Sequence, residues 1–303
     1  MKLHIKLAAI LAIAITSGAA HAQALTVATG DPAGTYSRMF KELNARCGQS
    51  IALTEQSSKG SMDNIDSIEG NQVNGAFVQT DVLVWRAQNE DLSGVKTLVA
   101  LAPEEIHVIA RADGKTEGGI FGIGAKRRMF NSVVDLAGQK VGAVGGSIIS
   151  AKVIALKANI PYTVVEFPDN KTALNALQHG DIDGVVAVGG SPLKVVSDLD
   201  ASYKLLSFPK NVLENVNILK VYRPTKVSYP RMNAVGIPTL STDALFVTRD
   251  YKTPQYAKGL VSLRQCLYAH LQELRETTGT HPKWQLVSAD NRGKWGWYAP
   301  DVK

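Results

Sequence analysis

Two hydrophobic periodicities alternate along this chain, and together they predict an α/β fold. Short apolar runs typical of strands occur at residues 25–27, 51–56, 76–79, 98–102, 106–110, 141–144, 162–167, 182–188 and 244–248. Apolar residues at helical spacing occur after Thr35 and at residues 62–69, 80–85, 149–158, 170–178 and 256–274. Because strands that alternate with helices form parallel sheets covered on both faces, we expect mostly parallel sheets flanked by helices.

The strand–turn–helix unit is repeated in both halves of the chain, which predicts two α/β lobes. A mature chain of about 280 residues is long enough to build two cores. A glycine-rich insertion at residues 114–128 precedes the second set of units. After it, four prolines predict short pieces of a surface-running return path: Pro209, Pro224, Pro230 and Pro238.

The first 22 residues have the pattern of a secretory signal peptide. Lys2 and Lys6 form a basic start, residues 7–15 are an unbroken apolar run, and Ala20-His21-Ala22 gives a small-x-small cleavage site. We therefore expect cleavage after Ala22 and a periplasmic location. No second apolar run approaches the roughly twenty residues of a membrane span, so the mature chain is expected to be soluble.

The charge balance is only modestly basic. The formal net charge is +6, and removal of Lys2 and Lys6 with the signal peptide leaves +4. Basic residues are not interleaved with aromatic residues, so nucleic acid is a poor candidate partner. The densest cluster, Lys126-Arg127-Arg128, is expected in a solvated loop.

The sequence contains two cysteines, Cys47 and Cys266. In an oxidising compartment an even pair favours one disulfide, which would join the end of the first helix to a helix near the C-terminus. Both ends of the chain would then belong to the same lobe. Two separate buried thiols are the alternative.

Motifs of known enzyme chemistry do not appear in the sequence. The histidines of the mature chain are not spaced as metal ligands, and HExxH, GxSxG, CxxC and a phosphate loop ending in Gly-Lys-Ser/Thr are missing. We therefore expect a protein that is not an enzyme and that has no cofactor, metal or catalytic residue.

Small and polar residues recur where the predicted strands end. They occur at residues 29–30, 34–36, 57–61, 79–81, 145–147 and 189–191. In open α/β sheets, ligands bind outside the carboxyl ends of the strands. The first of these turns, between a strand at Leu25 and a helix at Thr35, would leave backbone N–H groups free at a helix start. Such a site favours an anion, so a cleft for a small polar ligand is predicted between two hinged lobes.

Five longer segments follow one another along most of the mature chain. They are ATGDPAGTYSRMF (28–40), SSKGSMDNIDSIEGNQVNGAFVQTDV (57–82), LAPEEIHVIAR (101–111), DLAGQKVGAVGGS (135–147) and HGDIDGVVAVGGSP (179–192). These segments resemble motifs of the TAXI-type solute receptors of TRAP transporters, including the opening TGGxxGTYYxxG and the crossover strand LYPExxHLVxR. The resemblance implies a two-lobed periplasmic binding protein of type II-like fold, with a hinge of crossover strands. We expect residues 23–108 and 240–303 in the first lobe and residues 109–239 in the second.

The resemblance, taken position by position, also implies a ligand-binding set at the strand exits. The set is Gly30, Gly34, Thr35, Tyr36, Ser58, Ser61, Asn64, Gln79, Asp81, Ser147, Gly189 and Gly190. For Asn64 and Asp81 the alternative is helix capping and turn bracing. For Tyr36 it is a packed aromatic at a helix start.

Three departures from the family pattern leave the ligand's identity open. Ala102 stands where the family has tyrosine, residues 146–149 read Gly-Ser-Ile-Ile in place of Gly-Ser-Gly-Thr, and the insertion at 114–128 is longer than the family's link. Family members often bind acidic amino acids or other carboxylates. A ligand with an anionic group at the first helix start is therefore our expectation.

These patterns together predict an exported, monomeric receptor that captures a small organic anion, an amino acid or a carboxylate. Its expected partner is a TRAP-type membrane permease. A receptor for an ABC importer of the nitrate, sulfonate or thiamine-precursor type would share the fold, and so would a periplasmic ligand sensor of a two-component system. An enzyme is the remaining class.

Overall fold

The computed structural model describes residues 24–118 and 124–300, so the predicted signal peptide and the middle of the glycine-rich insertion lie outside the described residues. The strands are β1 (Leu25–Ala28), β2 (Leu53–Gln56), β3 (Gly75–Gln79), β4 (Val95–Arg111), β5 (Lys115–Glu117), β6 (Lys126–Arg128), β7 (Lys140–Ala143), β8 (Thr163–Glu166), β9 (Gly184–Gly189), β10 (Tyr203–Leu205), β11 (Arg223–Tyr229) and β12 (Ala234–Arg249). The α-helices are α1 (Thr35–Cys47), α2 (Ser61–Glu69), α3 (Thr80–Arg86), α4 (Gly146–Lys157), α5 (Asn170–His179), α6 (Lys194–Ser197), α7 (Lys210–Leu213), α8 (Val216–Leu219), α9 (Pro254–Ala269) and α10 (Leu271–Glu276). Three short 3₁₀ helices are η1 (Val133–Leu136), η2 (Pro230–Met232) and η3 (Pro282–Leu286). None of the described helices is both long and apolar enough to cross a bilayer.

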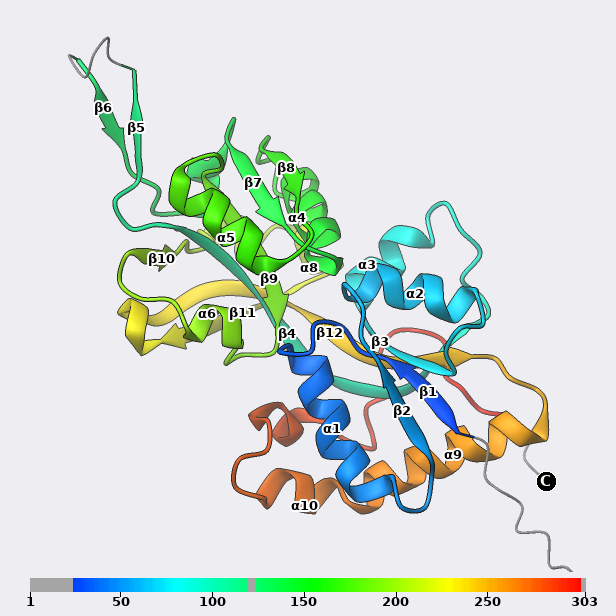
Figure 1. The fold of residues 1–303 in the computed structure, drawn as a ribbon. Coiled ribbons are helices and arrows are strands. Elements are labelled where there is room, and N and C mark those ends of the chain that lie inside the picture. The colour runs from blue at the N-terminus through cyan, green and yellow to red at the C-terminus, as the bar shows by residue number, and fades with distance from the viewer. Residues whose placement is uncertain (1–23, 119–123, 301–303) are drawn as a thin grey trace, which may run out of the picture.

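Two long strands, β4 and β12, run from one lobe into the other (Figure 1). In the described part of the chain, ten strands form one mixed sheet with the path β2-β1-β3-β12-β4-β9-β7-β8, while β10 pairs with β4 and β11 with β12. Strands β1, β2 and β3 are parallel in one lobe, and β7, β8 and β9 are parallel in the other. The predicted α/β fold, with two lobes and crossover strands between them, is confirmed. The predicted lobe boundaries fall within β4 and β12 and stay a prediction.

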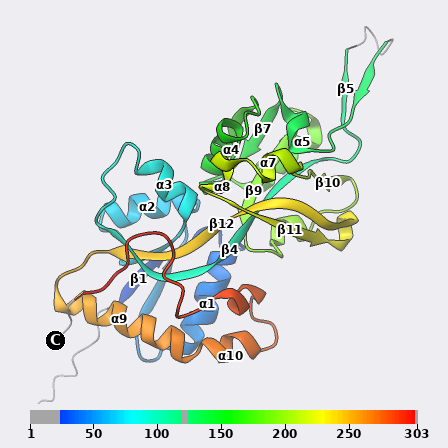
Figure 2. The same cartoon turned by 180° about the vertical axis from the view of Figure 1, so that it is seen from behind.

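Helices cover both faces of the first lobe's strands (Figures 1 and 2). Phe77 of β3 packs with the apolar faces of α1, α9 and α10 and stacks on Phe246 at a ring separation of 4.9 Å. Its neighbours Ala76 and Val78 pack with Ile65 of α2 in a separate core cluster. Successive strand side chains point to opposite faces, so every residue of β3 is buried.

One sequence prediction was wrong at the centre of the sheet. Residues 98–102 and 106–110 were expected as two strands separated by Pro103, but β4 is continuous from Val95 to Arg111. Pro103 is tolerated because the register between β4 and β12 shifts beside its partner Asp243. A proline lacks the N–H of a regular ladder and is accommodated at such irregularities.

Three other segments also differ from the elements that the sequence predicts. The proline-containing return path is largely a β11–β12 hairpin, turned through Asn233 with φ of 55°. The predicted long C-terminal helix is divided at His270 into α9 and α10. The cluster Lys126-Arg127-Arg128 forms strand β6 of a projecting hairpin, rather than a solvated loop, and pairs with β5 (Figure 1).

The predicted disulfide is confirmed. Cys47, at the end of α1, is bonded to Cys266 of α9 across 219 residues of sequence. The C-terminal tail also packs onto this lobe, since Trp284 is buried in the α1–α9 core and Trp295 Nε1 donates to the carbonyl of Val95 at 2.9 Å. Both ends of the described chain therefore belong to the lobe that contains β1.

Removal of this disulfide is expected to destabilise the fold. The bond closes a loop of 219 residues, and removal of a native crosslink typically lowers the free energy of unfolding by about 2–4 kcal/mol because the unfolded chain gains entropy. Urea unfolding of the Cys47→Ser/Cys266→Ser protein, compared with wild type, measures this loss. A reductant should destabilise the wild type and leave the double variant unchanged. Equal unfolding midpoints for the two proteins in the absence of reductant would contradict the prediction.

Candidate functional site

A cavity of about 320 Å³ lies between the two lobes, at the carboxyl ends of strands from both. Its lining comprises Gly30, Asp31, Pro32, Gly34, Thr35, Tyr36, Ser58, Lys59, Gly60, Ser61, Gln79, Glu104, Val144, Gly146, Ser147, Pro168, Asp169, Asn170, Ala187, Val188, Gly189 and Leu193. This volume is at the small end of the range for ligand pockets. Most of the residues predicted from the strand exits therefore meet in one place.

Several helices begin at this cavity; α5 is capped there by the side chain of Asp169, whereas α1, α2 and α4 begin without a side-chain cap. The N-cap residues of α1, α2 and α4 are Gly34, Gly60 and Gly145, and none supplies a side-chain oxygen to its helix. The first N–H groups of a helix have no partner within the helix, and the helix dipole makes that end positive. The cavity is thus a favourable environment for an anionic group.

The serine hydroxyls at the cavity are braced by the backbone. Ser61 Oγ accepts the N–H of Gln79 at 3.0 Å, and Ser147 Oγ accepts the N–H of Val188 at 3.0 Å. Ser58 Oγ donates to Asn64 Oδ1 at 2.6 Å. A hydroxyl that accepts one hydrogen bond still has its own proton to donate. Ser61 and Ser147 therefore combine a fixed position with a remaining donor.

A buried acid, Glu104, lies in the cavity lining on the crossover strand β4. Its side chain is 3% exposed, and Tyr36 donates its hydroxyl to Glu104 Oε2 at 2.7 Å. Burial raises the pKa of Glu104 to about 7, although hydrogen bonding from Tyr36 and Gln79 and the charge of Lys283 act in the opposite direction. This carboxyl group therefore titrates in the neutral range rather than near its ordinary pKa.

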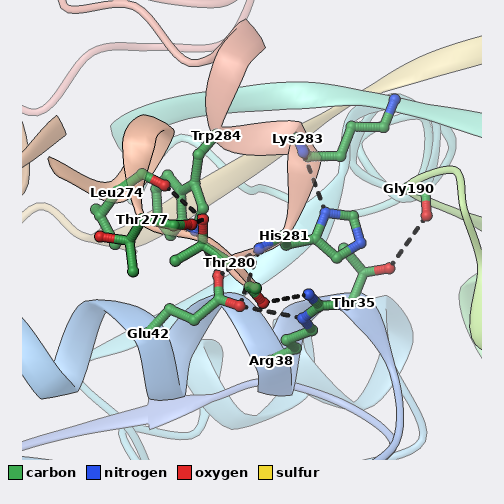
Figure 3. A network of polar contacts seen from close by, with 11 residues as sticks. Thr35, Arg38, Glu42, Gly190, Leu274, Thr277, Thr280, His281, Lys283 and Trp284 are labelled. Carbon is green, nitrogen blue, oxygen red and sulfur yellow. Dashed lines mark hydrogen bonds and ion pairs between the residues drawn. The ribbon is translucent and has the colours of Figure 1, made fainter. Parts of the chain in front are cut away.

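The two lobes meet at the rims of the cavity. On one rim Gly145 of the second lobe is packed so closely against the carbonyl of Lys59 that a Cβ atom there would overlap it. On the other rim Thr35 Oγ1 lies 3.5 Å from the carbonyl oxygen of Gly190 (Figure 3). The structure is therefore a closed arrangement of the lobes.

The helix that presents Thr35 is fixed by the C-terminal segment (Figure 3). Glu42 of α1 accepts the N–H of His281 at 2.9 Å and the indole N–H of Trp284 at 2.6 Å. The same carboxylate pairs with Arg38 at 3.1 Å. The start of α1 is thus held at the cavity by residues more than 200 positions away in sequence.

Three of the predicted site residues do not line the cavity. Asn64 is fully buried and donates to the carbonyls of Thr29 and Phe77, so it braces the turn after β1. Gly190 lies just outside, where its carbonyl faces Thr35. Asp81 lies behind the cavity at the start of α3.

Asp81 joins the lobes through hydrogen bonds. Its Oδ2 accepts the hydroxyls of Ser150, on α4, at 2.6 Å and of Tyr222 at 2.9 Å, and its Oδ1 accepts the N–H of Val82. Burial raises the pKa of Asp81, and these three donors oppose that rise. The bracing role that was the alternative for Asn64 and Asp81 is what their contacts show.

A second acid of β4, Glu105, links the tail to the second lobe. Glu105 Oε1 pairs with Lys283 Nζ at 2.5 Å, and its Oε2 accepts the N–H of Ser191 at 2.8 Å. Nearby, Tyr229 and His107 are hydrogen-bonded at 2.7 Å, and burial lowers the pKa of His107 to about 4. His107 is therefore neutral and structural at physiological pH.

Sequence reasoning missed Glu104, because Pro103-Glu104-Glu105 was read as a break between strands. The available signal was the family crossover motif, whose glutamate corresponds to Glu104. It also missed Lys59 and the segment 168–170, which reach the cavity from turns. Neither had a distinctive motif.

A family model described as the NMT1-like family matches residues 27–293. The chain belongs to the NMT1-like family. Among solved structures, a protein from Bordetella bronchiseptica matches this NMT1-like protein with a TM-score of 0.52 and 13% identity, over 88% of this chain and 76% of the other. The GluR0 ligand-binding core in complex with L-glutamate matches with a TM-score of 0.50 and 13% identity, over 83% and 95%. The substrate-binding protein of an amino acid ABC transporter has a TM-score of 0.49 and 10% identity, over 81% and 93%. At these identities, the first two matches show a shared two-lobed fold.

The buried acid predicts a pH-dependent stability difference in this NMT1-like protein. The folded pKa of Glu104 is raised from 4.5 to about 7, so its contribution to stability is complete below pH 4.5 and is lost as the pH rises through 7. Glu104→Gln has no such loss and still offers an acceptor to Tyr36. At pH 8 the variant should therefore exceed wild type in unfolding free energy by roughly 2–3 kcal/mol, with little difference at pH 4. Denaturant unfolding at both pH values tests this, and a difference that does not change with pH would contradict it.

Proposed function

We propose that this protein is a periplasmic solute-binding receptor that captures a small organic anion between its lobes. The observation that supports this most strongly is the cavity between the lobes at the starts of α1, α2 and α4, which lack side-chain caps. Anions bind at such helix starts through backbone N–H groups. The proposed contacts are the N–H groups of Thr35 and Tyr36, together with Ser61, Gln79, Ser147 and Gly189.

Transport by a membrane permease is the proposed role of this capture. The motif resemblance favours a TRAP-type permease as the partner, with the receptor exported as a monomer after cleavage at Ala22. Membership of the NMT1-like family is compatible with an ABC importer as well. Co-purification with a membrane-embedded permease, against co-purification with an importer that contains an ATPase, distinguishes the two.

Direct identification of the ligand tests the proposed function. Protein purified without added ligand is denatured, and the released small molecules are identified by mass spectrometry. The compound found, along with amino acids and carboxylates, is then titrated into refolded protein by calorimetry. We expect saturable binding of one anion per chain. Tight binding of a neutral sugar or a simple cation, without binding of any anion, would contradict the proposal.

Closure of the lobes over the ligand generates a second prediction. Gly145 has φ of 53° and is packed against the carbonyl of Lys59 in the other lobe. Gly145→Ala should therefore obstruct the closed arrangement. Because ligand contacts to both lobes form together only on closure, calorimetry should show affinity reduced at least about tenfold.

Gly138→Ala is the matched control for backbone strain. Gly138 also has a positive φ, of 77°, but no atom lies within 4 Å of an added Cβ. The Gly138→Ala protein should be somewhat less stable than wild type, because a residue with a Cβ atom is strained at positive φ. Its affinity for the ligand should equal that of wild type. Wild-type affinity in Gly145→Ala would exclude the closure prediction.

A further inference from the structure

The lining of the cavity contains one buried hydrogen-bond acceptor that lacks a donor among the described residues, as well as helix starts that attract anions. Gln79 is 4% exposed, it lines the cavity, and its Oε1 atom has no hydrogen-bond partner among the described residues. Glu104 lines the same cavity and is 3% exposed. A buried acceptor that remains unpaired costs free energy, which a donor on the ligand can recover.

We propose that the ligand carries an ammonium group beside its carboxylate, and that Glu104 and Gln79 bind this ammonium. The inference rests on the proposed function and narrows its ligand class to aminocarboxylates. It makes Glu104 the residue that distinguishes an amino acid from the same acid without its amino group. The carboxylate of the ligand would then accept hydrogen bonds from the N–H groups at the helix starts.

Among the residues that the structure describes, Glu104 forms no ion pair with a cationic side chain. Lys283, the cation that acts on its pKa, has its Nζ paired with Glu105 Oε1 at 2.5 Å. Lys59 is the one cationic residue among the cavity-lining residues described, and it is exposed at the rim. A buried carboxylate needs a partner of opposite charge to remain ionised at low cost. An ammonium group on the ligand would supply that charge.

A ligand acid without an amino group would be repelled by an ionised Glu104. Its carboxylate would share the cavity with Glu104, and two like charges at close range favour protonation of one. The groups that act on Glu104 are Tyr36 from α1, Glu105 from β4 and Lys283 from η3, while Gln79 from β3 adds a neutral amide. The charged residues that line the same cavity are Asp31, Lys59 and Asp169. Glu104 would have to bind a proton together with such a ligand.

The two ligand classes therefore differ in the direction of proton transfer. The pKa of free Glu104 is about 7, so at pH 7 an ammonium that binds its carboxylate displaces part of a proton. A plain carboxylate would instead draw a proton in. Affinity should rise with pH between 6 and 8 for the first class and fall for the second.

Calorimetry with matched pairs of ligands tests the proposal. Each pair is an amino acid and the acid that lacks only its amino group, such as L-glutamate with glutarate and L-leucine with 4-methylpentanoate. Titrations at pH 6, 7 and 8, in phosphate and in Tris, give the affinity and the number of protons released. For wild type we expect the amino member of at least one pair to bind about tenfold or more tightly than its partner, with proton release at pH 7.

Glu104→Gln should remove this preference. The amide retains an acceptor but has no negative charge. The affinity for the amino acid should therefore fall about tenfold, the affinity for the acid without the amino group should rise, and proton release on binding should disappear. Asp183→Asn is the matched control. Asp183 is a buried carboxyl group, 6% exposed, that pairs with Lys115 outside the cavity lining. Its loss should leave the ratio within each pair unchanged.

The outcomes separate the inference from the proposed function. If a plain acid binds as tightly as its amino partner, or binds with proton uptake, the inference is overturned and the receptor function stands. If the molecule released from the purified protein is an anion without an amino group, the conclusion is the same. If no pair and no released anion binds, both proposals fail.

Discussion

The pairing of β4 with β12 is the constraint on which both lobes depend. Each strand starts in one lobe and ends in the other, and their antiparallel register extends from Val95 opposite Arg249 to Glu105 opposite Ser241. A change in the angle between the lobes must therefore bend or twist these two strands. Residues on the strands, including Glu104, move little in such a change.

The lining of the cavity includes two kinds of residue, those on the crossover strands and those in the turns after short strands. The helix starts and the rim glycines come from turns that follow short strands, and their positions are set by the neighbouring strand ends. Ser61 and Ser147 hold those ends by accepting the N–H groups of Gln79 and Val188. Bracing of this kind fixes a donor before a ligand arrives, which reduces the entropy that binding would otherwise cost.

The sequence reveals the parts of the site that depend on local pattern. Strand–glycine turn–helix units are short, so their periodicity and turn residues locate Gly34 and Ser147 correctly at the cavity. Glu104 depends on distant partners instead, since Tyr36 precedes it by 68 residues. A proline followed by two acids reads locally as a loop, and buried acids are rare enough that this interpretation is normally right. The pairing with β12 is what keeps the segment in the sheet.

Two buried acids near the lobe interface show how donors distinguish a structural role from a binding role. Burial raises the pKa of both Asp81 and Glu104. Asp81 accepts hydrogen bonds from Ser150, Tyr222 and the backbone of Val82, so its acceptors are supplied by the chain itself, from both lobes. Glu104 faces a cavity, and the nearby lysine is already paired with Glu105. An acid whose hydrogen bonds join the two lobes stabilises their arrangement, whereas an acid that lines a cavity and has no ion pair there is available to a ligand.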